Sequence, residues 1–342
     1  MSDPNLLGSE LPLVAAPMAG GPSTPELAAA VCRAGAFAFI AAGYKTAETL
    51  AADVARARRN GSPFGVNLFV PAVGDISEAD LRRYARTLRP EADRFGLELP
   101  DSTPVAGDDG WHDKLDFLLS DPVPVVSVTF GLPTPQEVAA LRKAGSRVLV
   151  TVTTVEEAQS AADVGADALV AQGSAAGGHS GTHEPSRDIT AMPTELLTRD
   201  VIDATGLPTV AAGGVDGPQA VTKLIAVGAC AVAVGTMLLR TDESGASLTH
   251  KNALADPQFT ETVVTRAFTG RPARALRNRF IDRYDAIAPT GYPAVNALTR
   301  ELRRAAAAAG DPHRLHLWAG TGFRSAPTGS ARDVIERLAE RL

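Results

Sequence analysis

The segment from Gln172 to Gly181 carries the clearest chemical signal in the sequence, because it reads QGSAAGGHSG. Its glycines leave the backbone bare, so the main chain can lie flat against a planar ring, and they flank a single imidazole at His179. Histidine is the side chain best matched to proton transfer near neutral pH. A lone histidine is more often structural, but this one has only glycine and serine beside it and nothing apolar to pack against. We therefore predict that His179 is a catalytic residue.

Two glycine-bearing sites further along the chain have the chemistry to hold an anion. Gly213 and Gly214 follow one apolar run, Gly235 and Thr236 follow the next, and a Gly-Pro helix start lies at 217–218. Bare N–H groups and the positive end of a helix together attract phosphate. The alternative is that these glycines only permit tight turns, but their paired arrangement favours a phosphate site.

A metal site would be another use of the histidine, because His183 follows His179 by four residues. The intervening Ser-Gly-Thr does not favour the helix that would bring the two imidazoles to one face, and no carboxylates stand in suitable positions. Cys32 and Cys230 each lie in an apolar stretch, and two cysteines build neither a disulfide framework nor a cysteine-based zinc site. We expect no metal.

A weak internal repeat supplies the elements that would position these groups. Helix-like stretches end in glycine, and each glycine is followed by a short run of small and branched apolar residues. The four copies cover 33–40, 143–150, 163–170 and 226–234, with Gly35, Gly145, Gly165 and Gly228 at their junctions. A glycine at such a place adopts the left-handed conformation that ends a helix. The runs largely lack polar alternation, which is typical of parallel strands covered by helices.

Eight such runs can be traced along the chain. They are Leu13–Ala16, Ala36–Ala41, Phe64–Val70, Val125–Phe130, Arg147–Val152, Ala168–Ala171, Thr209–Ala212 and Ala231–Gly235. Eight strand-then-helix units predict an α/β fold of the (β/α)8 TIM barrel type, whose active site lies at the carboxyl ends of the strands. An open doubly wound sheet would call for a dinucleotide-binding fingerprint, which we do not find.

Two segments, 71–122 and 256–313, are longer than a minimal barrel needs. We predict that residues 1–255 and 314–342 form the barrel and that 256–313 is an inserted cap of helices and loops near its mouth. The late segment contains a basic cluster, made of Arg266, Arg271, Arg274, Arg277 and Arg279. Since exposed charge is normally solvated, we interpret this cluster as surface rather than as a substrate-binding site.

Four further side chains are candidates for the rim of the barrel. Tyr44 and Lys45 follow the second run, and loops at this end of a strand line the mouth of a barrel. Trp111 and Trp318 lie in inserted or late loops, so each would either cover the site or fill a gap.

The composition narrows the class of protein. Hydrophobic residues make up 45% of the 342 and charged residues 21%, so the chain can bury a large core. The net charge of −6 argues against a nucleic-acid or anionic-membrane partner. The N-terminus lacks a basic region, and no apolar run reaches membrane-spanning length. We expect a soluble cytoplasmic protein, and the oligomeric state stays open, with a small homo-oligomer as the commonest case.

The order of motifs along the chain resembles one enzyme family. PLVAAPMAGG, FGVNLFVP, AQGSAAGGHSG, VAAGGV and AVGTMLLRT together look like the nitronate monooxygenases, formerly called 2-nitropropane dioxygenases. The match runs from Pro12 to about Arg279, with a weaker echo at LWAGTGFR. Members of this family are FMN-dependent TIM-barrel enzymes. Single motifs such as PMAG and GGH also occur in related flavin barrels, including a flavin-dependent enoyl-acyl-carrier-protein reductase.

The resemblance implies a contact for each part of the flavin. Main chain at Pro17 and Met18 would pass beside the ring, and Asn67 would hydrogen-bond the isoalloxazine. Gln172 would contact the flavin edge or the ribityl chain. Small residues would complete the cofactor site, with Gly177 and Gly178 beneath the ring and, around the phosphate, Gly213, Gly214, Gly235 and Thr236.

His179 matches the active-site histidine of the family, which helps to position the nitronate and in some members removes the α-proton of a neutral nitroalkane. The chain departs from the family pattern at two places. Ala175 stands where an acidic or larger residue is usual, and Ala319-Gly320-Thr321 replaces an AGQ-like element, so we assign that element no flavin contact.

The function implied by the resemblance is the FMN-dependent oxidation of alkyl nitronates, such as propionate-3-nitronate, by O2 to a carbonyl compound and nitrite. The partners are then a small nitronate and O2. One alternative is an NAD(P)H-dependent flavin reductase that passes hydride to a quinone or an enoyl thioester on the same barrel. Another is a non-catalytic flavin or phosphate carrier, which would have no use for His179. The sequence leaves open the physiological nitronate, the preference between nitroalkane and nitronate, and the use of NAD(P)H.

Overall fold

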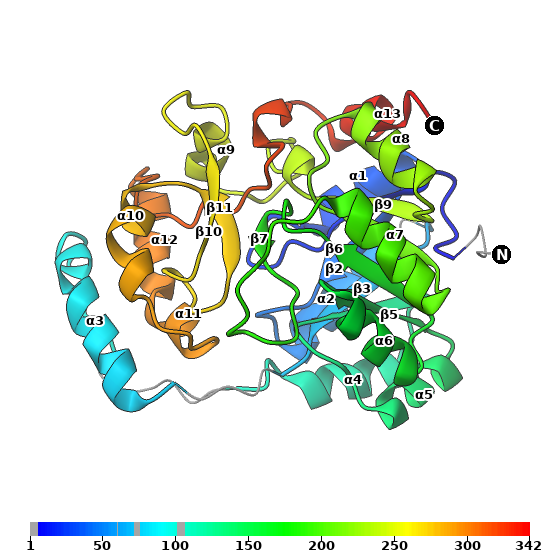
Figure 1. The fold of residues 1–342 in the computed structure, drawn as a ribbon, viewed down its shortest axis with the longest axis horizontal. Coiled ribbons are helices and arrows are strands. Elements are labelled where there is room, and N and C mark those ends of the chain that lie inside the picture. The colour runs from blue at the N-terminus through cyan, green and yellow to red at the C-terminus, as the bar shows by residue number, and fades with distance from the viewer. Residues whose placement is uncertain (1–5, 60, 72–75, 101–106) are drawn as a thin grey trace.

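Eight short parallel strands close into a barrel in the order β1-β2-β3-β4-β5-β6-β8-β9 (Figure 1). The structure, a computed structural model, describes residues 6–59, 61–71, 76–100 and 107–342. The barrel strands are β1 (Leu13–Ala15), β2 (Phe37–Ala41), β3 (Gly65–Phe69), β4 (Val125–Thr129), β5 (Arg147–Val152), β6 (Ala168–Gln172), β8 (Thr209–Ala212) and β9 (Ala231–Val234). They fall on the eight runs expected from the sequence, so the predicted (β/α)8 TIM barrel is confirmed.

Helices cover the outside of the barrel, and all of them except the last lie between two successive barrel strands in the chain. They are α1 (Pro25–Arg33), α2 (Ala47–Arg58), α4 (Trp111–Ser120), α5 (Pro135–Ala144), α6 (Val155–Asp163), α7 (Thr194–Thr205), α8 (Pro218–Ala226) and α13 (Ala331–Ala339). Helix α13 packs against α1 and α8 and so closes the ring (Figure 1). Helix α5 shows the expected signals, because Thr134 forms a capping box at its start and Gly145, at φ 102°, ends it.

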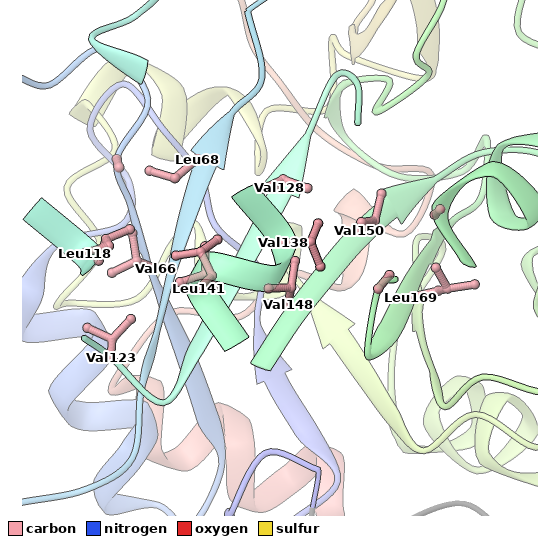
Figure 2. Close-up of a cluster of buried hydrophobic side chains, with 14 of the residues drawn as sticks. Val66, Leu68, Leu118, Val123, Val128, Val138, Leu141, Val148, Val150 and Leu169 are labelled. Carbon is pink, nitrogen blue, oxygen red and sulfur yellow. The ribbon is translucent and has the colours of Figure 1, made fainter. Parts of the chain in front are cut away.

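The barrel strands bury side chains on both faces. In β5, Leu149 packs with Val125 in the barrel interior, whereas Val148 and Val150 belong to the layer between the strands and the helices. Figure 2 shows this outer layer, with Val138 of α5 beside the valines of the strands. Burial on both sides explains why the runs lacked polar alternation, and it makes the strand ends a rigid frame for the residues that follow them.

The chain leaves the barrel after β6 and forms β7 (Gly178–His179) outside it. Strand β7 pairs with β11 (Ala273–Leu276), which pairs in turn with β10 (Thr262–Thr265), so that His179 lies opposite Ala273. Strand β8 then takes the place beside β6. In Figure 1, β7 lies between the barrel strands and the β10–β11 pair, so this small antiparallel sheet holds His179 outside the barrel.

The remaining helices gather on one side of the barrel (Figure 1). They are α3 (Glu78–Asp93), α9 (Leu248–Ala253), α10 (Arg279–Tyr284), α11 (Ala294–Leu298) and α12 (Arg300–Ala308). Helix α3 comes much earlier in the chain but shares an apolar core with residues of 256–313, in which Leu81 joins Phe268. Its Glu91 accepts a hydrogen bond from Tyr284 at 2.8 Å. We therefore propose a cap made of residues 256–313 together with α3; the division of the chain into barrel and cap otherwise stays a prediction.

The other regular segments are short turns of 3₁₀ helix. They are η1 (Thr236–Leu238), η2 (Asp285–Ile287) and η3 (Phe323–Ser325). Within the described ranges, no helix combines the length and the apolar character that a membrane span requires.

Candidate active site

A cavity of about 640 Å³ opens where the carboxyl ends of the barrel strands face the cap, a size that suits a cofactor or a drug-sized ligand. Every site residue predicted from the sequence lines it. These residues are Pro17, Met18, Asn67, Gln172, Gly177, Gly178, His179, Gly213, Gly214, Gly235 and Thr236. The structure thus brings together positions from the ends of five barrel strands, while their individual roles stay predictions.

Two of the glycines are required by backbone packing. A Cβ on Gly177 would lie 2.5 Å from the carbonyl carbon of Ala319 and from the nitrogen of Gly320. A Cβ on Gly213, whose φ is 110°, would lie 2.8 Å from the nitrogen of Ala176. No flexible side chain is available to move aside at either place, so only glycine lets these three backbone segments meet. The result is a flat, bare floor to the cavity.

The predicted phosphate site presents free donors. Within the described residues, the backbone N–H groups of Gly214, Gly235 and Thr236 donate no hydrogen bond to the protein. Helix α8 begins close by, and its N-cap, Gly217, offers no side-chain cap to the first turn. Unused N–H groups beside a helix N-terminus are what a phosphate requires. This arrangement fits the phosphate of FMN.

Asn67 and Gln172, the two cavity amides predicted to contact the flavin, differ in which hydrogen-bonding groups remain available to a ligand. Asn67 is buried, and its Nδ2 donates to Ser127 Oγ at 2.9 Å and to Thr129 Oγ1 at 3.0 Å, which leaves its oxygen to accept from a ligand. Gln172 uses both ends of its amide within the loop that follows β6. Its Oε1 accepts from the N–H of Gly181 at 2.6 Å, and its Nε2 donates to the carbonyl of His179 at 3.3 Å. Gln172 therefore holds the histidine loop in shape, and its predicted flavin contact stays a prediction.

His179 is enclosed by aromatic rings and cations. Its ring lies 5.8 Å from Phe130, 5.6 Å from Tyr292 and 5.3 Å from Trp318, measured between centroids. Burial, followed by the charges of two nearby arginines, lowers the pKa of His179 to about 3. The imidazole is therefore neutral near pH 7. It can act as a base or as a neutral hydrogen-bond donor, but it cannot supply a positive charge.

The hydroxyl of Thr269 fixes the orientation of His179. Thr269 Oγ1 lies 2.9 Å from Nε2 of His179, and the same hydroxyl donates to the carbonyl of Arg271 at 3.3 Å. When this hydroxyl donates to the carbonyl, it accepts from Nε2–H, and this arrangement requires the tautomer with its proton on Nε2. The lone pair is then on Nδ1, the nitrogen suited to take a proton from a ligand.

Arg271 shows that the surface interpretation of the basic cluster is wrong for this residue. Its side chain is 0% exposed, and its guanidinium carbon lies 4.0 Å from the centre of the Phe130 ring. Its Nε donates to the carbonyl of Ser180 at 3.3 Å, and its Nη2 donates to the carbonyl of Thr182. Arg271 thus ties the loop after His179 to the cap. By contrast, Arg277 is exposed and paired, as the surface interpretation expected.

The four rim candidates divide evenly. Tyr44 and Trp318 line the cavity, and Tyr44 is joined to Tyr292 by a hydrogen bond of 3.1 Å between the two hydroxyls. Lys45 instead pairs with Asp53 at 2.8 Å. Trp111 is buried in the barrel core, where its indole N–H donates to a carboxylate oxygen of Glu137 at 2.8 Å.

His183 has a structural role. Its Nε2 lies 3.0 Å from the carbonyl of Thr151, and its backbone N–H donates to Glu157 at 2.9 Å. The part of the chain that the structure describes contains no cluster of three or more His, Cys, Asp or Glu side chains arranged to hold a metal ion.

The charge of the cavity is one-sided. Among the described residues that line it, there is no aspartate or glutamate, whereas α12 contributes Arg300, Arg303 and Arg304. Neither these arginines nor Thr269 and Tyr292 are predicted as site residues from the sequence. They carry no local motif, and only the packing of the cap onto the barrel brings them to His179.

Comparisons with known proteins agree with this geometry. The family model for nitronate monooxygenase matches residues 6–341. Probable nitronate monooxygenases from Staphylococcus aureus strains Newman and MSSA476 are 33% identical over 342 residues, covering 98% of this chain and 96% of theirs. The solved nitroalkane oxidase of Streptomyces ansochromogenes is 47% identical with a TM-score of 0.94, covering 99% of this chain and 97% of its own. FabK of Thermotoga maritima is 25% identical with a TM-score of 0.75, covering 98% and 94%.

Proposed function

The chain belongs to the nitronate monooxygenase family, and on this premise we propose that it is an FMN-dependent enzyme that oxidises alkyl nitronates with O2 to a carbonyl compound and nitrite. The observation that carries the proposal is the neutral, oriented imidazole of His179 above a bare glycine floor, in a cavity whose described lining has no carboxylate. Such a site suits a planar cofactor and a small anion.

The residues that would hold FMN follow from the site. The N–H groups of Gly214, Gly235 and Thr236 would bind its phosphate, and Asn67 would accept a hydrogen bond from its ring. Bound there, FMN would supply the electron transfer between substrate and oxygen. The bare backbone around Gly177 and Gly178 would leave one face of the ring accessible.

His179 acts on the substrate proton. A nitronate already lacks its α-proton and needs no base, but a neutral nitroalkane must first lose it. Nδ1 of His179 carries the lone pair that can take this proton, since Thr269 holds the other ring nitrogen. Replacing His179 with Asn should therefore lower turnover of nitroethane by about 100-fold or more, while flavin stays bound.

The test combines cofactor analysis with oxygen consumption. Flavin released from the purified protein is identified as FMN, FAD or neither, and O2 uptake and nitrite are measured with propionate-3-nitronate, nitroethane and NADH. Nitronate-dependent uptake with little NADH oxidation supports the proposal. NADH oxidation without nitronate turnover would select the flavin reductase instead. The exposed His112→Asn, on α4, serves as the matched control and should leave all rates unchanged.

The cytoplasmic location and the homo-oligomeric state expected from the sequence stay predictions.

A further inference from the structure

Arg303 is the cation of α12 that the protein holds in a fixed position. Its Nε donates to Thr299 Oγ1 at 3.1 Å, and its Nη2 donates to the backbone carbonyl and the side-chain oxygen of Asn296 at 2.8 and 2.7 Å. Thr299 is itself buried and donates to the carbonyl of Phe268. These contacts pin two nitrogens of the guanidinium. The third, Nη1, donates to no described residue, on a side chain that lines the cavity.

Arg303 also lacks a counter-charge. No carboxylate of the described residues lies within ion-pair distance of it, whereas its neighbour Arg304 pairs with Glu301 at 2.6 Å. Burial lowers the pKa of Arg303 to about 10, which still leaves it cationic at neutral pH. Arg303 is half-buried, so its unpaired charge carries a desolvation cost that a bound anion would reduce.

The cation lines the same cavity as His179. Its charge is one of the causes that lower the pKa of His179, and it also acts on Tyr44 and Tyr292. The other candidates for a positive charge are less suitable. His179 is neutral, and Arg271 lies against the Phe130 ring and does not line the cavity, although its buried Nη1 has no partner.

We propose that Arg303 is the specificity-determining residue that binds the anionic nitronate, and that it sets the preference for a nitronate over the neutral nitroalkane. This inference rests on the proposed function. A nitronate carries its negative charge on the two oxygens, so a fixed guanidinium N–H makes a charge-assisted hydrogen bond to it. A nitroalkane has the same oxygens without net charge and gains much less. His179 thus removes the proton of the neutral nitroalkane, whereas Arg303 binds the negative charge of the nitronate.

The test compares Arg303→Met with ethyl nitronate and nitroethane as a matched pair. The loss of one charge-assisted hydrogen bond should lower kcat/KM for ethyl nitronate by about 10- to 100-fold, and kcat/KM for nitroethane by less than about 3-fold. Arg303→Lys keeps a charge and should recover most of the difference. Arg332→Met, on the exposed face of α13, is the matched control and should change neither value.

A binding measurement gives a second readout that does not depend on turnover. Nitrate is a planar monoanion with oxygens like those of a nitronate, and its dissociation constant is measured by titration calorimetry on the flavin-loaded protein. Arg303→Met should weaken nitrate binding by about 10-fold or more, and Arg303→Lys by less.

Three outcomes overturn the inference. In the first, Arg303→Met lowers kcat/KM equally for both substrates. In the second, it lowers kcat/KM for neither. In the third, the nitronate preference is lost in Arg300→Met rather than in Arg303→Met. If the unaltered protein oxidises neither substrate, the proposed function fails, and nitrate binding still decides whether Arg303 holds an anion. If Arg303→Met does not fold, Arg303→Gln is used, with the same expectations.

Discussion

The barrel and the cap build one cavity from different parts of the chain. The barrel contributes mainly backbone, in the bare glycines at 177 and 213–214 and the free N–H groups beside α8. The cap contributes side chains with hydroxyl groups and charge, above all Thr269 and Arg303. Backbone placed by regular strands suits a ligand that must be held in one fixed position. Side chains on an inserted segment suit the choice among small substrates, because they can change without disturbing the barrel.

The largest expected effect would come from a substitution at a glycine that the barrel contributes to the cavity floor. Gly177→Ala forces a Cβ to within 2.5 Å of two backbone atoms, so we expect flavin to be lost and stability to fall by about 1–3 kcal/mol. Gly145→Ala is the matched control. Unlike Gly177 it has a positive φ, but no atom lies within 4 Å of the new Cβ, so the change should cost about 1 kcal/mol and keep flavin. Flavin content and Tm are measured, and equal flavin content in both variants would contradict the backbone role.

A smaller, more selective effect is expected on the cap side. Thr269→Val removes the partner of His179 Nε2, so kcat/KM for nitroethane should fall by about 10-fold, while ethyl nitronate changes by less than about 3-fold. Thr269→Ser restores the hydroxyl and should restore nitroethane turnover. Thr198→Val removes an equally buried hydroxyl from α7 and serves as the control. Loss of both activities, without rescue by serine, would mean that Thr269 acts only in folding.

The smallest effect is a shift in pH dependence. Burial, Arg271 and Arg303 together hold the pKa of His179 below its ordinary value, so the neutral base persists into acid. Arg271→Met removes one of these causes and leaves burial and Arg303. The pKa of His179 should therefore rise, and the acid limb of the pH profile of kcat/KM for nitroethane should move to higher pH. Arg271→Lys keeps the charge and should leave this limb nearly in place. The profile is recorded from about pH 3 to 8, because the pKa of His179 lies at about 3; an unmoved limb in Arg271→Met would exclude this role.

The difference between the barrel and the cap also explains which features could be predicted from the sequence. Gly35 and Gly145 end helices by a local rule, and the valine and alanine runs that follow such glycines identify barrel strands, because each signal lies within a few residues. His179 was found in the same way. Its partner Thr269 is 90 residues away and reaches it only through the pairing of β7 with β11. The sequence predicts a surface position for Arg271 because its partners are backbone carbonyl groups, which every residue has and which no sequence pattern marks. Long-range packing, rather than local pattern, decides these positions.

The meeting of Gly177 with residues 319–320 has a consequence for biosynthesis. One wall of the flavin pocket is laid down only when the polypeptide returns from the cap, and Gly320 then donates to Thr236 at 2.9 Å. A ribosome-bound chain that ends before residue 319 has the glycines of the cavity floor but lacks the segment that packs against Gly177. The cavity is therefore complete only once residues 319–320 have packed against Gly177 and Thr236.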